Sequence, residues 1–332
     1  MSPTISVVMP VYNAAGTVET AIRSILRQTV HDFELIIYDD GSTDDSVACA
    51  RAAAAGDKRV HIEAGPHVGI VEALQRGCAL ANGDYLARMD ADDDMEPVRF
   101  ERQLAYMASD PEIAICGTSV RMVGAHVGPG RRRYERWINR LTTHHAIMNE
   151  LFVECPIPHP TFMMRRKVFE TIGGYQERGW AEDYDCCMRA ALAGYRFVKA
   201  PERLVHWRES PMRLSMNDER YSPSRFRALK RHYLFQIHPL AGRRLVQWGA
   251  GSVGKPWLRE WNDPRPTAVV DINPRKIGEM IHRVPVVTPE ELPAPEQGFI
   301  VVAVGTEGAR DEIRSWMLPR GYQERKDFIF VA

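Results

Sequence analysis

An apolar run passes directly into a group of acidic residues in the segment Tyr85-Leu86-Ala87-Arg88-Met89-Asp90-Ala91-Asp92-Asp93-Asp94. We expect Tyr85–Met89 to form a buried strand that ends at the first of these acids. Side chains alternate along an extended chain, so Asp90 and Asp92 should lie on the same face. Carboxylates of this kind suit Mg²⁺ or Mn²⁺, which are often held together with substrate phosphates. The segment therefore predicts a site for a metal and a nucleotide, and a solvated acidic turn is the structural alternative.

A second strand upstream ends in the same way. The apolar runs Ile5–Met9 and Phe33–Tyr38 read as buried strands, and the second continues into Asp39 and Asp40. Helical periodicity separates the strands, at about residues 17–26, 43–55 and 70–81. This alternation predicts an α/β fold with a mostly parallel central sheet flanked by helices, and ligands bind beyond the carboxyl ends of such strands. Asp39 and Asp40 are thus candidate acceptors for a base or ribose, or else form part of a helix cap.

Composition limits the class of protein. The 332 residues carry 43 Lys+Arg against 43 Asp+Glu, and this balance argues against a dedicated nucleic-acid binder. No apolar run reaches 18 residues, no signal peptide is visible, and the six cysteines show no CxxC spacing. We expect a cytoplasmic protein of two domains, residues 1–238 and 243–332, joined at His238-Pro239-Leu240-Ala241-Gly242.

A third acidic pair, Glu182 and Asp183, opens a predicted helix after Gly173-Gly174-Tyr175. Carboxylates in a first turn complement the helix dipole, which is the structural interpretation. A carboxylate close to an acceptor hydroxyl could instead act as a general base. The sequence around these residues leaves both interpretations open.

The C-terminal part carries a separate glycine motif. Gly249, Gly251 and Gly254 follow the predicted strand Leu245–Trp248, and Asp271 ends the next strand. This is the spacing of a dinucleotide-binding turn, with the acid placed for a ribose hydroxyl. About 90 residues are too few for two mononucleotide-binding halves. The segment predicts a small Rossmann-like domain, serving either docking or structure or a possible second nucleotide site.

The motifs together resemble those of family-2 glycosyltransferases over about residues 4–215. The N-terminal likeness lies in residues 6–13, 24–29 and 33–44, the acidic segment 82–93 resembles the family's DxD segment, and Glu182-Asp183, approached through His159-Pro160, resembles its ED segment. The resemblance implies a GT-A fold, a nucleotide-sugar donor, a divalent metal (Mg²⁺ or Mn²⁺) and inversion at the anomeric carbon. Similar short Rossmann-like modules end some bacterial envelope glycosyltransferases.

Carried over residue by residue, the resemblance assigns roles to particular side chains. Asp92 would bind the metal, Asp90 the metal and the ribose or sugar side, and Asp183 would be the base, with Glu182 orienting it or the acceptor. His206 is similar to a family position that approaches the diphosphate or metal, although it could simply pack beside Trp207. The donor nucleotide would be bordered by Pro10, Tyr12, Asn13, Asp39 and Asp40.

The predicted activity is transfer of a sugar from a nucleotide-diphosphate donor, with UDP favoured, to a glycan or lipid-linked acceptor in cell-envelope polysaccharide synthesis. Arg131, Arg132 and Arg133 could meet an anionic acceptor at the inner face of the membrane, or form a solvated basic loop. We expect no nucleic-acid partner and at most peripheral membrane contact. The alternatives are a sugar nucleotidyltransferase and a nucleotide-binding scaffold or regulatory protein that uses the C-terminal module.

Overall fold

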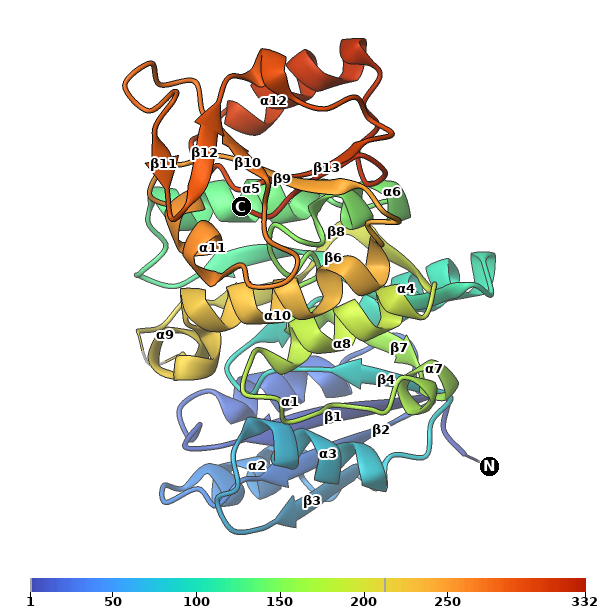
Figure 1. Ribbon diagram of the computed structural model, residues 1–332. Coiled ribbons are helices and arrows are strands. Elements are labelled where there is room, and N and C mark those ends of the chain that lie inside the picture. The colour runs from blue at the N-terminus through green and yellow to red at the C-terminus, as the bar shows by residue number, and fades with distance from the viewer. Residues whose placement is uncertain (1, 212) are drawn as a thin grey trace. The chain divides into compact units, whose positions relative to one another are not determined.

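The computed structural model describes residues 2–211 and 213–332, and the chain forms two compact units (Figure 1). The first comprises Met1–Ile147 and Cys155–Arg225, and the second Met148–Glu154 and Phe226–Ala332. This division falls earlier in the chain than the predicted linker at residues 238–242. Lys230, in the helix that precedes this predicted linker, explains the difference. Its ammonium group donates to the carbonyl oxygens of Val153 (2.8 Å) and Val331 (3.0 Å), and these contacts attach the helix to the second unit.

The first unit is built on an eight-stranded mixed sheet. Only β7 and β5 run antiparallel to their neighbours, so the carboxyl ends of the other six strands share one edge. The arrangement confirms the predicted α/β class. The order across the sheet is β3 (Val60–Ala64), β2 (Phe33–Asp39), β1 (Ile5–Val11), β4 (Tyr85–Arg88), β7 (Met163–Arg165), β6 (Ile113–Val123), β8 (Arg196–Arg208) and β5 (Asp94–Met95).

Helices and short 3₁₀ turns connect these strands. They are α1 (Val18–Leu26), α2 (Ser46–Ala54), α3 (Ile70–Leu80), α4 (Arg99–Ser109), α5 (Pro129–Arg140), α6 (His144–Glu150), η1 (His159–Thr161), α7 (Arg166–Thr171), α8 (Glu182–Leu192), α9 (Leu214–Asn217) and η2 (Glu219–Tyr221). Among the described residues, no helix is both long and apolar enough to cross a membrane.

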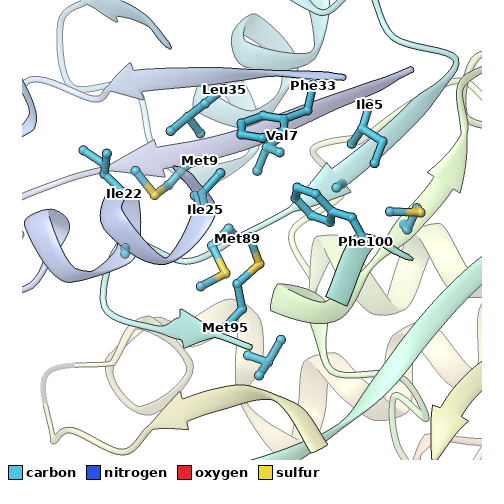
Figure 2. Packing of buried hydrophobic residues seen from close by; sticks show 14 of the residues in the cluster. Ile5, Val7, Met9, Ile22, Ile25, Phe33, Leu35, Met89, Met95 and Phe100 are labelled. Carbon is cyan, nitrogen blue, oxygen red and sulfur yellow. The ribbon is translucent and has the colours of Figure 1, made fainter. Parts of the chain in front are cut away.

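The main core lies between α1 and the strands beneath it (Figure 2). Ile22 and Ile25 of α1 meet Val7 and Met9 of β1, and Phe100 of α4 packs beside them; all five side chains are buried. Burying one such side chain contributes about 1.5–3 kcal/mol. This packing fixes β1, and with it the neighbouring strands whose ends carry the acidic residues.

The second unit has a six-stranded sheet that is parallel except for β11. Counting from β9, its parallel strands are arranged 3-2-1-4-5, which is the Rossmann-like order and confirms the predicted second α/β module. The strands, in order across the sheet, are β11 (Met280–Ile281), β12 (Val284–Val287), β10 (Ala268–Val270), β9 (Arg244–Trp248), β13 (Gly298–Val302) and β14 (Phe328–Phe330). The remaining elements are α10 (Pro223–Ile237), α11 (Gly254–Glu260), η3 (Pro289–Glu291), α12 (Ala309–Met317) and η4 (Leu318–Arg320).

Candidate functional site

Three carboxylates converge in the turn after β4. Asp90, Asp92 and Asp93 each offer one oxygen, and these atoms lie within 4.8 Å of one another. The end of β8 holds the turn in place, because the backbone N–H of Arg208 donates to Asp93 Oδ1 (2.7 Å) and its Nε donates to the carbonyl of Asp92 (2.9 Å). Arg88, the last residue of β4, bonds to Asp90 Oδ1 through Nη2 at 2.5 Å. The predicted pair Asp90 and Asp92 is thus brought together, and Asp93 joins it.

The charge on this cluster is only partly compensated. Burial, and then the neighbouring Asp90, raise the pKa of Asp92 to about 6, and the same causes raise the pKa of Asp93 well above its usual range. Burial also acts to raise the pKa of Asp90, but Arg88 outweighs it, and the pKa of Asp90 is lowered. Asp93 Oδ2 is buried and has no hydrogen-bond partner in the described part of the chain. A donor set of oxygens with an unpaired buried acceptor fits a hard divalent cation.

Besides Arg88, the cation that acts on the three carboxylates is Arg213 rather than His206. The Nδ1 of His206 lies 2.6 Å from Asp94 Oδ1 and its Nε2 lies 3.4 Å from Glu96, and His206 is not among the three grouped ligands. The positive charge of the Arg213 guanidinium acts to lower the pKa of Asp92 and Asp93, but burial and the neighbouring carboxylates have the larger effect and both pKa values are raised.

Two contacts hold the Arg213 side chain. Its guanidinium pairs with Glu209 and lies 4.6 Å from the centre of the Trp207 ring. An arginine so placed can attract the phosphate groups of a ligand.

Asp39 and Asp40 differ in what their side chains do. Asp40 is fully engaged: its carboxylate accepts from the backbone N–H of Val68 (2.7 Å) and Gly69 (3.0 Å) and pairs with His67 (2.9 Å). Asp39 Oδ2 accepts only from Ser42 N–H (3.0 Å), and its buried Oδ1 has no hydrogen-bond partner among residues 2–211 and 213–332. The structure therefore favours Asp39 over Asp40 as an acceptor for a ligand.

An exposed aromatic pair lies at the same edge. The ring of Tyr12 stacks on His67, with centroids 4.2 Å apart and planes 21° apart, and Tyr12 keeps 48% of its surface exposed. Asn13 has a positive φ of 49°, and its Oδ1 accepts from Thr43 N–H (2.8 Å), which fixes the turn after β1. Pro10 is buried within β1. Tyr12 and His67 therefore offer a flat surface on which a base could stack.

Glu182 and Asp183 open α8, as the sequence predicts, but only one of them is accessible. Glu182 is 2% exposed, accepts from the Tyr221 hydroxyl (2.8 Å) and lies 3.5 Å from His159 Nδ1. Asp183 is partly exposed. His159 also acts electrostatically on Asp90, so the third acidic pair and the carboxylate cluster lie in one region of the first unit.

The glycine turn of the second unit has packing reasons of its own. A Cβ on Gly249 would lie 2.5 Å from the carbonyl oxygen of Ala303, and one on Gly254 would lie 1.9 Å from that of Gly249, whereas Gly251 faces open space. Asp271 is also engaged, because its carboxylate accepts from Ala250 N–H (3.1 Å) and Lys276 Nζ (2.9 Å). A second nucleotide site at this turn stays a prediction.

Some site residues were not found from the sequence. In the sequence Asp93 is only one member of an acidic run, because strict strand alternation would turn its side chain away from those of Asp90 and Asp92. His67 and Arg213 lie in loops without a recognisable motif. The signal that could have indicated them is position, since His67 follows β3 and Arg213 follows β8 at the shared edge of the sheet.

Comparisons with known proteins agree with this geometry. The sequence model of Glycosyl transferase family 2 matches residues 6–173. Putative glycosyltransferase EpsE of Bacillus subtilis is 31% identical over 62% of this chain and 73% of its own length. The amylovoran biosynthesis glycosyltransferase AmsE of Erwinia amylovora is 28% identical over 60% of this chain and 74% of its own. An uncharacterized glycosyltransferase of Haemophilus influenzae, 29% identical over 62% of this chain, is matched over 65% of its length, so the chain spans about two thirds to three quarters of these relatives.

Solved structures share the fold at low sequence identity. TarS of S. aureus in complex with UDP-GlcNAc superposes with a TM-score of 0.58 at 17% identity, over 73% of this chain and 67% of that one. The mannosyltransferase PcManGT of Pyrobaculum calidifontis, in complex with GDP-Man and Mn²⁺, gives a TM-score of 0.51 at 19% identity, over 71% and 63%. The likeness supports the GT-A type of fold for the region that it covers.

Proposed function

Because the chain belongs to glycosyl transferase family 2, we propose that it transfers a sugar from a nucleotide-diphosphate donor to an acceptor hydroxyl, with inversion and with Mg²⁺ or Mn²⁺ as cofactor. The observation that carries this proposal is the convergence of Asp90, Asp92 and Asp93 at the carboxyl edge of the sheet. Family membership favours the transferase over the nucleotidyltransferase and scaffold alternatives.

The donor would lie along that edge. Tyr12 and His67 would stack on the base, and Asp39 would accept a hydrogen bond from the base or the ribose. Two proteins of similar fold are named as complexes with UDP-GlcNAc and with GDP-Man and Mn²⁺, which supports a nucleotide-sugar donor. We favour UDP as the nucleotide.

The carboxylates and Arg213 would serve the diphosphate end of the donor. Asp92, with Asp90 and Asp93, would hold a divalent metal, which supplies charge neutralisation to the departing diphosphate. Arg213 would add a second positive charge on the side next to Trp207 and Glu209. His206, which pairs with Asp94, would keep the end of β8 attached to β5.

Asp183 would be the general base. It would accept the proton of the acceptor hydroxyl while that oxygen forms a bond to the anomeric carbon and the bond from this carbon to the diphosphate breaks. Its partial exposure supports this role, whereas the buried and doubly engaged Glu182 is suited to positioning. The acceptor would be a glycan or lipid-linked hydroxyl in cell-envelope polysaccharide synthesis, at the cytoplasmic side with at most peripheral membrane contact. One relative is named for the biosynthesis of amylovoran, which supports a role in biosynthesis of this kind.

Nucleotide binding tests the donor site. We expect UDP, GDP or dTDP to raise the melting temperature when Mn²⁺ is present and not in EDTA. Asp92→Ala should abolish this metal dependence, whereas Asp84→Ala, at the opposite end of β4, should retain it. If none of these nucleotides changes the melting temperature in the presence of Mn²⁺, the result contradicts the proposed function.

Turnover tests the base. Asp183→Asn should keep nucleotide binding and lose at least 100-fold, to order of magnitude, in the rate of sugar transfer from the donor that the wild-type chain uses. Unchanged turnover in this variant removes Asp183 from the role of base.

A further inference from the structure

Four side chains from separate segments form a continuous chain of contacts in the first unit, and all but the partly exposed Tyr221 are buried. The Tyr175 hydroxyl bonds to His159 Nε2 (2.7 Å), His159 Nδ1 faces Glu182 Oε1 (3.5 Å), and Glu182 Oε2 accepts from the Tyr221 hydroxyl (2.8 Å). These residues come from the segment after α7, from η1, from the first turn of α8 and from η2. Both carboxylate oxygens of Glu182 therefore have partners within this set, and its side chain is held away from an acceptor.

Burial makes these contacts strong. Glu182, His159 and Tyr175 are 2%, 8% and 6% exposed. Burial acts to raise the pKa of Glu182, but the hydrogen bond from His159, together with Tyr221, outweighs it, and the pKa is lowered. Hydrogen bonds to a charged group in such surroundings are about twice as strong as neutral ones.

The segment that ends in Tyr221 also carries Arg213, which lies beside the carboxylate cluster. Two other side-chain ion pairs leave this end of the segment within the described chain. Arg220 pairs with Glu177 at 3.2 Å and Glu219 with Arg225 at 3.4 Å, and the side chains of Glu177 and Glu219 are 55% and 80% exposed. Exposed ion pairs contribute little. The hydrogen bond from Tyr221 to Glu182 is therefore the principal anchor of η2 on α8.

We propose that Glu182 is a positioning residue: with His159 and Tyr221 it forms a latch that fastens residues 213–222 to the helix that presents Asp183. The latch would hold Arg213 and Asp183 in register, so that the group that attracts the diphosphate and the group that takes the proton act on one substrate. The fastening stands on the contacts alone, and its consequence for catalysis rests on the proposed function.

Hydrogen–deuterium exchange tests the latch directly. Backbone N–H groups of Met216, Asp218, Tyr221 and Ser222 are hydrogen-bonded inside the segment and report its opening. In Tyr221→Phe we expect these amides to exchange about 10-fold faster, while the amides of β1 stay protected. Tyr195→Phe is the matched control, because that hydroxyl makes no hydrogen bond to other described residues. Unchanged exchange in Tyr221→Phe overturns the proposal.

Substitutions of Glu182 separate its hydrogen bond from its charge. Glu182→Gln keeps an acceptor oxygen for Tyr221 but loses the charge, so its amides should exchange faster than in the wild-type chain and slower than in Tyr221→Phe. Glu182→Ala should exchange as fast as Tyr221→Phe. Equally fast exchange in Glu182→Gln and Glu182→Ala contradicts a latch made by this hydrogen bond.

Binding and turnover show whether the latch matters for the reaction. In Tyr221→Phe, the affinity for the nucleotide with Mn²⁺ should fall about 5- to 10-fold, and the rate at saturating donor should fall as well, whereas Asp183→Asn should lose rate and keep affinity. Unaltered affinity despite faster exchange overturns the catalytic half of the proposal. If the wild-type chain binds no nucleotide, the proposed function fails, while the exchange experiment still decides whether the latch exists.

Discussion

Arg88 offers a sharp test of the carboxylate cluster. Its side chain is 5% exposed, it pairs with Asp90 at 2.5 Å, and its Nε and Nη1 are buried without hydrogen-bond partners within the described ranges. Arg88→Met would remove the cation and leave Asp90 beside two further carboxylates. Breaking a buried ion pair from one side costs about 3–5 kcal/mol, and we take about 3 kcal/mol because the Asp90 side chain is 31% exposed.

That cost should depend on metal. For a unit of this size, about 3 kcal/mol corresponds to a fall of about 6–12 °C in melting temperature, which we expect in EDTA. With saturating Mn²⁺ the cation takes over the neutralisation, so more than half of the deficit should disappear. Binding is reciprocal, and the variant should therefore bind Mn²⁺ more tightly than the wild-type chain.

A matched variant controls for the loss of an arginine side chain that is hydrogen-bonded within the sheet. Arg165 donates to the carbonyl oxygens of Ile113 (2.9 Å) and Met107 (2.6 Å) and pairs with no carboxylate in the described chain. Arg165→Met should lower the melting temperature equally in EDTA and in Mn²⁺. If Arg88→Met also lowers the melting temperature equally in EDTA and in Mn²⁺, the result would refute the view that the cluster binds a cation and that Arg88 partly neutralises its charge.

Three further predictions address pH, backbone and nucleotide. Burial lowers the pKa of Lys199 to about 7, so above pH 7 the unfolded chain holds a proton on Lys199 that the folded chain has lost. The free energy of unfolding should therefore rise between pH 7 and about 8.5, by up to about 1.4 kcal/mol per pH unit. Urea unfolding of Lys199→Met should show a smaller increase of this free energy with pH. Gly254→Ala should destabilise the second unit by about 2–3 kcal/mol, because its Cβ would meet the Gly249 carbonyl oxygen, while Gly251→Ala, in open space, should change the melting temperature little; equal effects would contradict the packing argument. Tyr12→Ala should weaken nucleotide binding about 10-fold in calorimetry, and an unchanged Kd would exclude stacking on Tyr12 and His67.

Local patterns were enough to predict the first half of the sheet. β1, β2 and β4 are apolar runs buried on both faces, and α1 shows the helical spacing of Val18, Ile22 and Ile25. Each of these elements is long enough for its period to be read without knowing its neighbours. The shared edge then follows from parallel topology, which is why the acidic residues after β2 and β4 could be placed together.

Local periodicity does not predict the helices and strands of residues 113–160. β6 buries Thr118 and Ser119 in its middle, so its apolar run is interrupted, and α5 carries five arginines and buries only Glu135 and Ile138. Neither element has enough apolar residues at one period to be recognised. Both form because tertiary neighbours accept them: β8 pairs along almost the whole of β6, and Arg132 and Asn139 of α5 bond to the β6 backbone.

Neighbouring acids in one motif differ in their contacts for reasons that lie outside the motif. Asp39 and Asp40 stand next to each other, yet Asp40 accepts from the N–H groups of the loop after β3. Glu182 is buried against Tyr221 and His159, whereas the neighbouring Asp183 is partly exposed. The partners that decide this are 23 to 39 residues away in the sequence. A local spacing rule identifies the pair but cannot choose between its members. That choice depends on which carboxylate the fold supplies with buried donors, because such a carboxylate is stabilised in place and is no longer available to a substrate.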